Sequence, residues 1–264
     1  MALEAALVEL QDLTERLRRE CPWDREQTVR TIVPHTVEEA YEVADAALAG
    51  EPDKLVDELG DLLFQVYFLA LLLEEEGQGD LETVARAVHA KLVRRHPHVF
   101  GDAEARTAER VRERWEEIKA EQEGREGIFH DVPGSLPALL HARKVQRRAA
   151  AVGYDWPDLE GPLAKVREEL GELEEALAST GTTAPETEPD AAVFGEVGDL
   201  LFTVANVARK LNVDPELALR ATTHRFVQRV EQAERLAKDA GLRWTDLDLE
   251  AQDRYYALAK EQLR

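Results

Sequence analysis

Cysteine and basic charge are both scarce in this sequence of 264 residues. A single cysteine, Cys21, excludes a disulfide within the chain. Lysine and arginine number 33 against 54 acidic residues, for a net charge of −21. This balance excludes a broad basic surface for a nucleic-acid backbone and disfavours an anionic membrane. A small anionic ligand therefore requires metal cations or a local basic cluster.

Export and membrane-spanning signals are also missing. The opening residues, MALEAALVEL, carry no basic segment ahead of an apolar core. The longest nearly continuous apolar run, residues 62–73, is too short to span a bilayer. We therefore expect a cytoplasmic protein that binds neither nucleic acid nor a membrane. The sequence also contains no P-loop, GxGxxG, CxxC or HExxH motif.

The sequence contains no alternating runs of β-branched and aromatic residues, which are typical of strands. Apolar residues instead recur at three- and four-residue spacing, which predicts an all-α protein. One irregular stretch is expected near residues 21–34. We expect helices over residues 2–20, 35–49, 53–76, 80–95, 103–123, 136–151, 159–178, 190–211, 214–240 and 246–263.

The chain consists of two similar halves separated by a segment rich in glycine and proline, GREGIFHDVPGSLP. The motif ExGDLLF occurs at residues 58–64 and again at 196–202. The upstream motif EExxE occurs at 38–42 and again at 168–172. The repeat predicts two helical domains joined by a linker, at residues 1–123, 124–137 and 138–264.

The repeated acidic motifs favour a metal site in each half. Helical spacing places several carboxylates on one face, and crowding them is unfavourable unless cations neutralise the charge. Oxygen ligands suit Mg²⁺, or alternatively Mn²⁺, whereas a ferritin-like di-iron site requires Glu-x-x-His, which neither half contains. A single ExxE pair is usually a solvated face, but here the whole arrangement occurs twice. The candidate residues are Glu38, Glu39, Glu42, Glu58 and Asp61, and Glu168, Glu169, Glu172, Glu196 and Asp199.

Basic and aromatic residues downstream of these motifs are candidates for nucleotide contact. The i,i+4 pairs Lys91 with Arg95 and Arg225 with Arg229 are suited to polyphosphate oxygens, or alternatively form a surface face. Lys165 lies one turn before the second EExxE motif. Trp115 and Tyr256 are able to stack on a base or to serve in packing.

Five segments together resemble one family. They are CPWDREQT at 21–28, VEEAYEV at 37–43, DELGDLLFQV at 57–66, RRHPHVFGD at 94–102 and RWEEIKAE at 114–121. They resemble the MazG nucleoside triphosphate pyrophosphohydrolases in their tandem-domain form. The resemblance implies two MazG-type helical bundles in a homodimer. It also implies Mg²⁺-dependent hydrolysis of nucleoside triphosphates between the α- and β-phosphates to a monophosphate and pyrophosphate, in nucleotide-pool house-cleaning.

The resemblance also implies residue roles. One carboxylate of each EExxE motif is expected to accept a proton from water, with Glu168, Glu169, Glu38 and Glu39 as candidates. The implied metal ligands are Glu169, Glu172, Glu196, Asp199, Glu39, Glu42, Glu58 and Asp61. The implied nucleotide contacts are Lys165, Arg225, Arg229, Tyr256 and Lys260, and in the first half Lys91, Arg95, Trp115 and Lys119.

Two alternative functions remain open at this point. The first is a non-catalytic helical dimer that binds nucleotide and Mg²⁺ and acts on a regulatory partner. The second is a phosphohydrolase that releases orthophosphate from the γ-position. The residues leave open the base and sugar preference.

Overall fold

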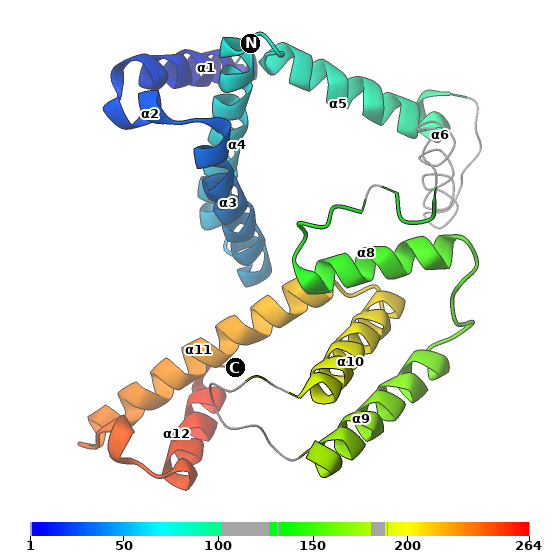
Figure 1. Cartoon of the computed structure of the whole chain (residues 1–264). Coiled ribbons are helices and arrows are strands. Elements are labelled where there is room, and N and C mark those ends of the chain that lie inside the picture. Colours follow the sequence, from blue (N-terminus) through cyan, green and yellow to red (C-terminus); the bar gives the residue numbers. More distant parts are fainter. Residues whose placement is uncertain (1, 102–126, 131, 181–187, 189, 264) are drawn as a thin grey trace. The chain divides into compact units, whose positions relative to one another are not determined.

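The computed structural model describes residues 2–101, 127–130, 132–180, 188 and 190–263 (Figure 1). Within these ranges the chain forms helices and no strand, which confirms the predicted all-α fold. The chain comprises two compact units, Met1–Gly124 and Arg125–Arg264, and the boundary between them falls at the start of the predicted linker. The expected helix at 103–123, with Trp115 and Lys119, and most of the 180–190 loop lie outside the described residues.

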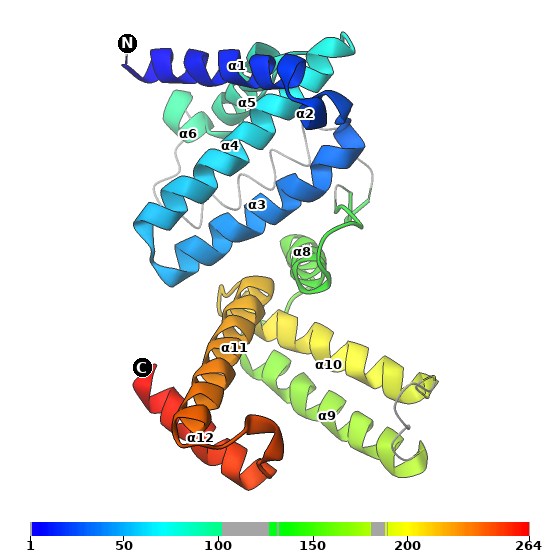
Figure 2. The ribbon, with the colours of Figure 1, turned by 90° about the vertical axis from the view of Figure 1, so that its left-hand side faces the viewer.

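Unit 1 is built around an antiparallel helix pair. The pair consists of α3, Val29–Ala49, and α4, Pro52–Glu75, which lie side by side along their length (Figure 2). Across them lie α1, Ala2–Glu20, and the short α2, Pro22–Glu26. From the end of α4, α5, Leu81–Arg95, leads away from the pair and is followed by α6, Pro97–Phe100 (Figure 1).

The core of unit 1 lies between α3 and α4. Ile32, Phe68 and Leu72 are buried there, and Phe64 and Leu69 pack against them. Burial of such side chains contributes about 1.5–3 kcal/mol each, so this cluster holds the two acidic helices together. The pairing therefore fixes which faces of α3 and α4 meet.

The expected irregular stretch at residues 21–34 is wrong for most of its length. Part of it forms α2, and α3 begins at Val29 rather than at residue 35. The early start follows from a capping box, in which Thr28 and Thr31 each accept a hydrogen bond from the other's backbone N–H. This cap offsets the cost of Pro34, whose missing N–H interrupts the second turn of the helix.

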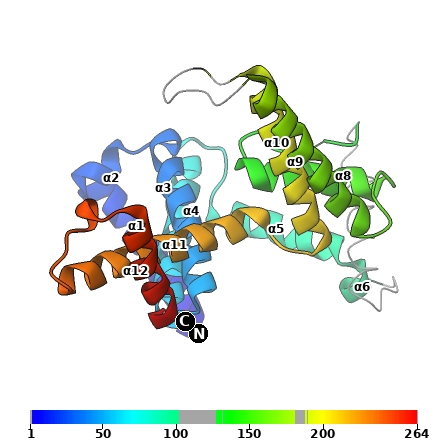
Figure 3. The same cartoon turned by 90° about the horizontal axis from the view of Figure 1, so that it is seen from below.

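Unit 2 repeats the antiparallel pair with α9, Glu160–Thr180, and α10, Ala191–Lys210. Helix α8, Ala138–Ala151, packs on α10. Helix α11, Pro215–Asp239, packs on α12, Leu249–Gln262, with a 3₁₀ turn, η1, at Trp244–Asp246 between them (Figure 3). Asp214 caps α11 ahead of Pro215, as its sequence position predicts.

Large apolar side chains remain exposed on α4 and α10. Phe194, Leu201 and Phe202 are 71%, 51% and 46% exposed on α10, and Leu63 is 38% exposed on α4. Within a single chain, part of the apolar surface of these two helices is therefore not covered. By length and composition α10 is apolar enough to cross a membrane, which differs from the expectation drawn from the apolar runs, and 17% of its apolar window is buried.

Candidate metal centre

The first carboxylate cluster, Glu39, Glu42, Glu58 and Asp61, lies between α3 and α4. Glu39, Glu58 and Asp61 each offer an oxygen, and these oxygens lie within 4.8 Å of one another. Glu42, one turn after Glu39 on the same helix, interacts with Glu39 and Glu58. The antiparallel packing of α3 and α4 thus brings the EExxE motif of one helix next to the ExGD motif of the other.

The second carboxylate cluster, Glu169, Glu172, Glu196 and Asp199, lies between α9 and α10. Oxygens of Glu169, Glu196 and Asp199 again lie within 4.8 Å of one another. Glu172 interacts with Glu169 and Glu196. The structure therefore brings together in each unit the four carboxylates for which the sequence predicts metal coordination.

Both clusters are electrostatically strained without a cation. Burial raises the pKa of Glu39 and of Glu58, and neighbouring carboxylates raise both further. The pKa of Glu172 is raised by burial and by Glu169, although Lys165 opposes the shift. Because each shift reflects a disfavoured negative charge, a divalent cation at either cluster relieves the repulsion.

The donor set fits a hard divalent cation. Mg²⁺ holds oxygens at about 2.1 Å in an octahedron, so its ligand oxygens lie about 3 to 4.2 Å apart, within the observed limit of 4.8 Å. Neither cluster, as the structure describes it, contains histidine or cysteine, which disfavours a zinc or ferritin-like di-iron site. Magnesium or manganese is therefore the best match.

The residues beside the clusters differ between the units. Lys165 Nζ lies 2.8 Å from Glu168 Oε1 and 2.7 Å from Glu169 Oε1, and these contacts raise the pKa of Lys165. In unit 1, His35 Nδ1 lies 3.8 Å from Glu38 Oε2. Of the four candidate proton acceptors, Glu38 and Glu168 are exposed and flank their clusters on the solvent side, whereas Glu39 and Glu169 belong to the clusters.

The residues predicted from the sequence do not include one basic side chain beside the first cluster. Lys54 on α4 acts on Glu58 and opposes the rise of its pKa. The signal was present in the sequence, because Lys54 precedes Glu58 by four residues and so shares its helix face. Sequence position 192, the place equivalent to Lys54 in the second half, is occupied by alanine.

The remaining predicted nucleotide contacts lie on helices that leave the acidic pairs. Lys91 and Arg95 belong to α5, and Arg225 and Arg229 belong to α11. Each of these helices starts after the end of α4 or α10 and runs away from the acidic pair (Figures 1 and 3). Tyr256 and Lys260 lie on α12, which packs on α11. With the exception of Lys165 on α9, the predicted nucleotide contacts that the structure describes therefore lie on other helices than the carboxylate clusters.

Further contacts are local to these helices. Arg225 donates a hydrogen bond of 2.9 Å to the hydroxyl of Thr222. The rings of Phe226 and Tyr256 pack against each other with their centres 5.9 Å apart. Tyr256 therefore has a packing role.

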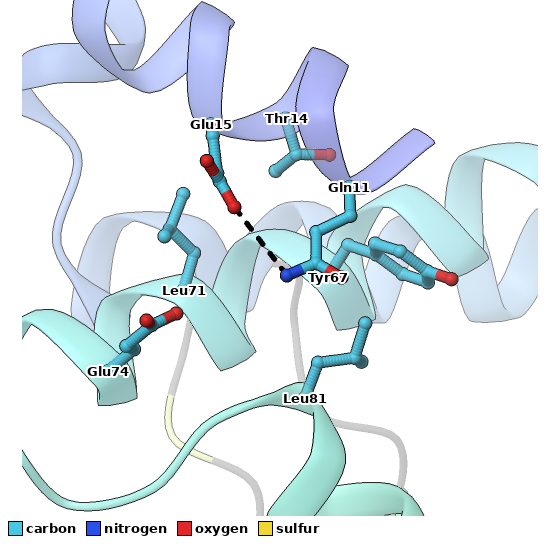
Figure 4. A pocket seen from close by; sticks show the side chains of 7 residues that line it. All are labelled: Gln11, Thr14, Glu15, Tyr67, Leu71, Glu74 and Leu81. Atoms are coloured by element: carbon cyan, nitrogen blue, oxygen red, sulfur yellow. Dashed lines mark hydrogen bonds between the residues drawn. The ribbon is translucent and has the colours of Figure 1, made fainter. Parts of the chain in front are cut away.

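A hollow between α1, α4 and the start of α5 is a poor candidate for a triphosphate (Figure 4). Its lining contains two carboxylates and no lysine or arginine, and its volume is about 240 Å³ including open solvent. The hydroxyl of Thr14 already donates to the Leu10 carbonyl. The residues that line the hollow are Gln11, Thr14, Glu15, Tyr67, Leu71, Glu74 and Leu81.

The chain is similar to known nucleotide pyrophosphohydrolases. Residues 27–100, which span α3 and α4, match the MazG nucleotide pyrophosphohydrolase domain. The nucleoside triphosphate pyrophosphohydrolase of Escherichia coli is 43% identical over 92% of this chain and 91% of its own length. The nucleoside triphosphate pyrophosphohydrolase/pyrophosphatase MazG of Thermotoga maritima is 40% identical over 96% of this chain and 94% of its own length.

The crystal structure of a mazG-related protein from Thermotoga maritima matches 42% of this chain and 96% of its own length, at 28% identity and a TM-score of 0.38. The Escherichia coli and Thermotoga maritima pyrophosphohydrolases match nearly the full chain, whereas the family domain matches residues 27–100 alone. They confirm the family resemblance that the sequence motifs indicated. The chain therefore belongs to the MazG family of nucleotide pyrophosphohydrolase enzymes.

Proposed function

We propose that this enzyme hydrolyses nucleoside triphosphates, ribo- or deoxyribo-, between the α- and β-phosphates, and that it requires Mg²⁺. The observation that carries the proposal is the convergence of Glu169, Glu196 and Asp199 oxygens within 4.8 Å. The activity named for relatives at 40–43% identity supports the same reaction. The products are a nucleoside monophosphate and pyrophosphate.

The two carboxylate clusters would hold the metal. When bound, Mg²⁺ supplies neutralisation of the triphosphate charge and lowers the pKa of a coordinated water. Glu168 is our candidate to accept the proton from the attacking water, because it is exposed beside the second carboxylate cluster. Glu169 is less suited to that role because its side chain is 6% exposed and its oxygen belongs to the cluster.

A homodimer accounts for two features of the single chain. A second copy would cover the apolar side chains exposed on α4 and α10, as the amphipathic pattern of a helix bundle requires. It would also allow basic residues on α11 of one copy to approach the acidic pair of the other. Because α10 carries Glu196 and Asp199 within a carboxylate cluster, we favour a partner helix over a membrane as its cover.

Product analysis tests the proposed reaction. The full chain is incubated with each triphosphate and with Mg²⁺, Mn²⁺ or a chelator, and the products are resolved by anion exchange. Formation of monophosphate and pyrophosphate in equal amounts, and only when the metal is present, supports the proposal. Running the reaction in heavy-oxygen water then shows whether the label enters the monophosphate, which identifies the α-phosphorus as the point of attack.

The same experiment separates the alternative functions. Diphosphate and orthophosphate would identify a γ-phosphate hydrolase, whereas nucleotide binding without product would identify a non-catalytic dimer. A house-cleaning role is a proposal that rests on the family resemblance, and a cytoplasmic location is a proposal that rests on the scarcity of cysteine. The first is tested by comparing kcat/KM for damaged and ordinary nucleotides, and the second by cell fractionation.

A further inference from the structure

Lys165 places its ammonium group against a carboxylate of the second cluster, where the metal is proposed to bind. Its ammonium nitrogen lies 2.7 Å from Glu169 Oε1 and 2.8 Å from Glu168 Oε1. Glu169 is a member of the cluster, and its side chain is 6% exposed, whereas the side chain of Lys165 is 35% exposed. A cation of the chain itself therefore pairs with a buried carboxylate that belongs to the metal site.

The helix places this lysine beside the whole acidic face. Residues 165, 168, 169 and 172 follow one another at three- and four-residue spacing, so they share one face of α9. Lys165 acts through space on Glu172 as well as on its two hydrogen-bonded partners. The ammonium group is thus close to two of the four members of the cluster.

Unit 1 offers a natural comparison. His35 takes the equivalent place one turn before the first EExxE motif, and its Nδ1 lies 3.8 Å from Glu38. Lys54, which lies on α4 four residues before Glu58, acts on that carboxylate through space. The basic side chain beside the EExxE carboxylates is therefore a lysine at the second cluster and a histidine at the first.

We propose that Lys165 is a built-in counter-ion of the second carboxylate cluster, which a divalent cation must displace from Glu169. The displaced ammonium group is then free to pair with a phosphate oxygen of the nucleotide. On this proposal, which rests on the metal site proposed above, the second cluster binds metal alone weakly and binds metal together with a triphosphate more strongly. Lys165 thereby couples metal loading to the arrival of substrate.

Titration with Mn²⁺ in the absence of nucleotide tests the proposal without measuring turnover. Free Mn²⁺ is followed by electron paramagnetic resonance in full-length protein carrying Asp61→Asn, which weakens the first cluster. A chain with both Asp61→Asn and Asp199→Asn measures binding to the remaining acidic surface. Lys165→Met keeps the length of the side chain and removes its charge, whereas Lys165→Arg keeps the charge.

We expect Lys165→Met to tighten Mn²⁺ binding roughly twofold to fivefold, the factor that corresponds to the free energy of a partly exposed ion pair. Lys165→Arg should bind Mn²⁺ like the parent, and His35→Met, tested against the first cluster in an Asp199→Asn chain, should change little. Thermal melts establish that each variant is folded, and Lys165→Gln serves as a second neutral variant if Lys165→Met is not.

The outcomes are distinguishable. If the Asp61→Asn chain binds no more Mn²⁺ than the double variant, the proposed metal site itself is wrong. If it binds Mn²⁺ but the neutral lysine variants bind equally well or more weakly, the metal site stands and the counter-ion role of Lys165 is overturned. Tighter binding in the neutral variants, with parental binding in Lys165→Arg, supports the counter-ion.

Discussion

Arg18 and Glu75 lie 57 residues apart in the sequence, and their side chains form a two-point ion pair. Arg18 Nε lies 2.8 Å from Glu75 Oε1, and Nη2 lies 2.7 Å from Oε2. The pair ties α1 to the end of α4. Unit 2 makes a related tie with the charges reversed, where Asp155 pairs with Arg209 and Lys210 at the end of α10. In both units, ion pairs thus anchor the segment before the first acidic helix to the end of the second acidic helix.

Replacing Arg18 with alanine should destabilise unit 1 by about 2 kcal/mol, the range for a charge-assisted network with several hydrogen bonds. Arg18 also donates to the backbone carbonyls of Asp24 and Gln27, which would lose their partner. Lysine at this position should recover about half of the loss, because it cannot make the two-point contact. Urea unfolding measures the change. Arg16→Ala, at an exposed ion pair, is the control and should change stability by less than about 0.5 kcal/mol.

The same pair predicts a dependence of stability on pH. The hydrogen bond from Arg18 lowers the pKa of Glu75. A carboxyl with a lowered folded pKa stabilises the fold above its unfolded pKa near 4.3, and this contribution is lost as pH falls through the folded pKa. Glu75→Gln should therefore lower the Tm at neutral pH and reduce its fall in acid. A Tm curve for Glu75→Gln that runs parallel to the parent curve throughout would contradict this role.

The carboxylate clusters predict the opposite dependence for the metal-free protein. Burial raises the pKa of Glu39, Glu58 and Glu172 above the ordinary value of 4.5. Because these groups hold protons more tightly when folded, their contribution to stability declines as pH rises above that value. Added Mg²⁺ should therefore raise the Tm more at about pH 7.5 than at about pH 5. Differential scanning fluorimetry at matched ionic strength checks this, and an equal shift at both pH values would count against it.

Inactivating each cluster separately should show how turnover is divided. We expect Asp199→Asn to lower kcat by about 100-fold or more, as loss of a metal ligand does. The effect of Asp61→Asn on kcat then gives the share of turnover that depends on the first cluster. Pyrophosphate release measures both, and Glu250→Gln, at an exposed residue of α12, is the control. Full activity in the double variant would refute the assignment of both clusters.

A charged residue on the exposed face of α10 should weaken the proposed dimer. Leu201→Glu places a carboxylate on a surface that the partner copy would cover, and burying it there is costly. Sedimentation velocity should show a shift from dimer towards monomer. Leu249→Glu at the first turn of α12 is the matched control and should leave the oligomeric state unchanged. A parent chain that sediments as a monomer would contradict the dimer itself.

The sequence predicts local features well where a local interaction decides them. Helix α5 begins after Asp80, whose side chain accepts a hydrogen bond from the Thr83 N–H, and Gly50 ends α3 in the left-handed conformation. The expected start of this helix at residue 35 is wrong, because the Thr28–Thr31 capping box permits a helix that begins before Pro34. A three-residue reciprocal cap between two threonines is a weaker sequence signal than a proline.

The sequence by itself determined the helical class, the repeat and the residues of each carboxylate cluster, because helical periodicity assigns residues at three- and four-residue spacing to one face. It could not determine which faces meet, since that depends on the packing of two helices. Tertiary structure decided that Glu169 meets Glu196 and Asp199, that Lys165 pairs with Glu169, and that Leu201 remains exposed. Burial and charge proximity are properties of packed helices, and no single helix carries them.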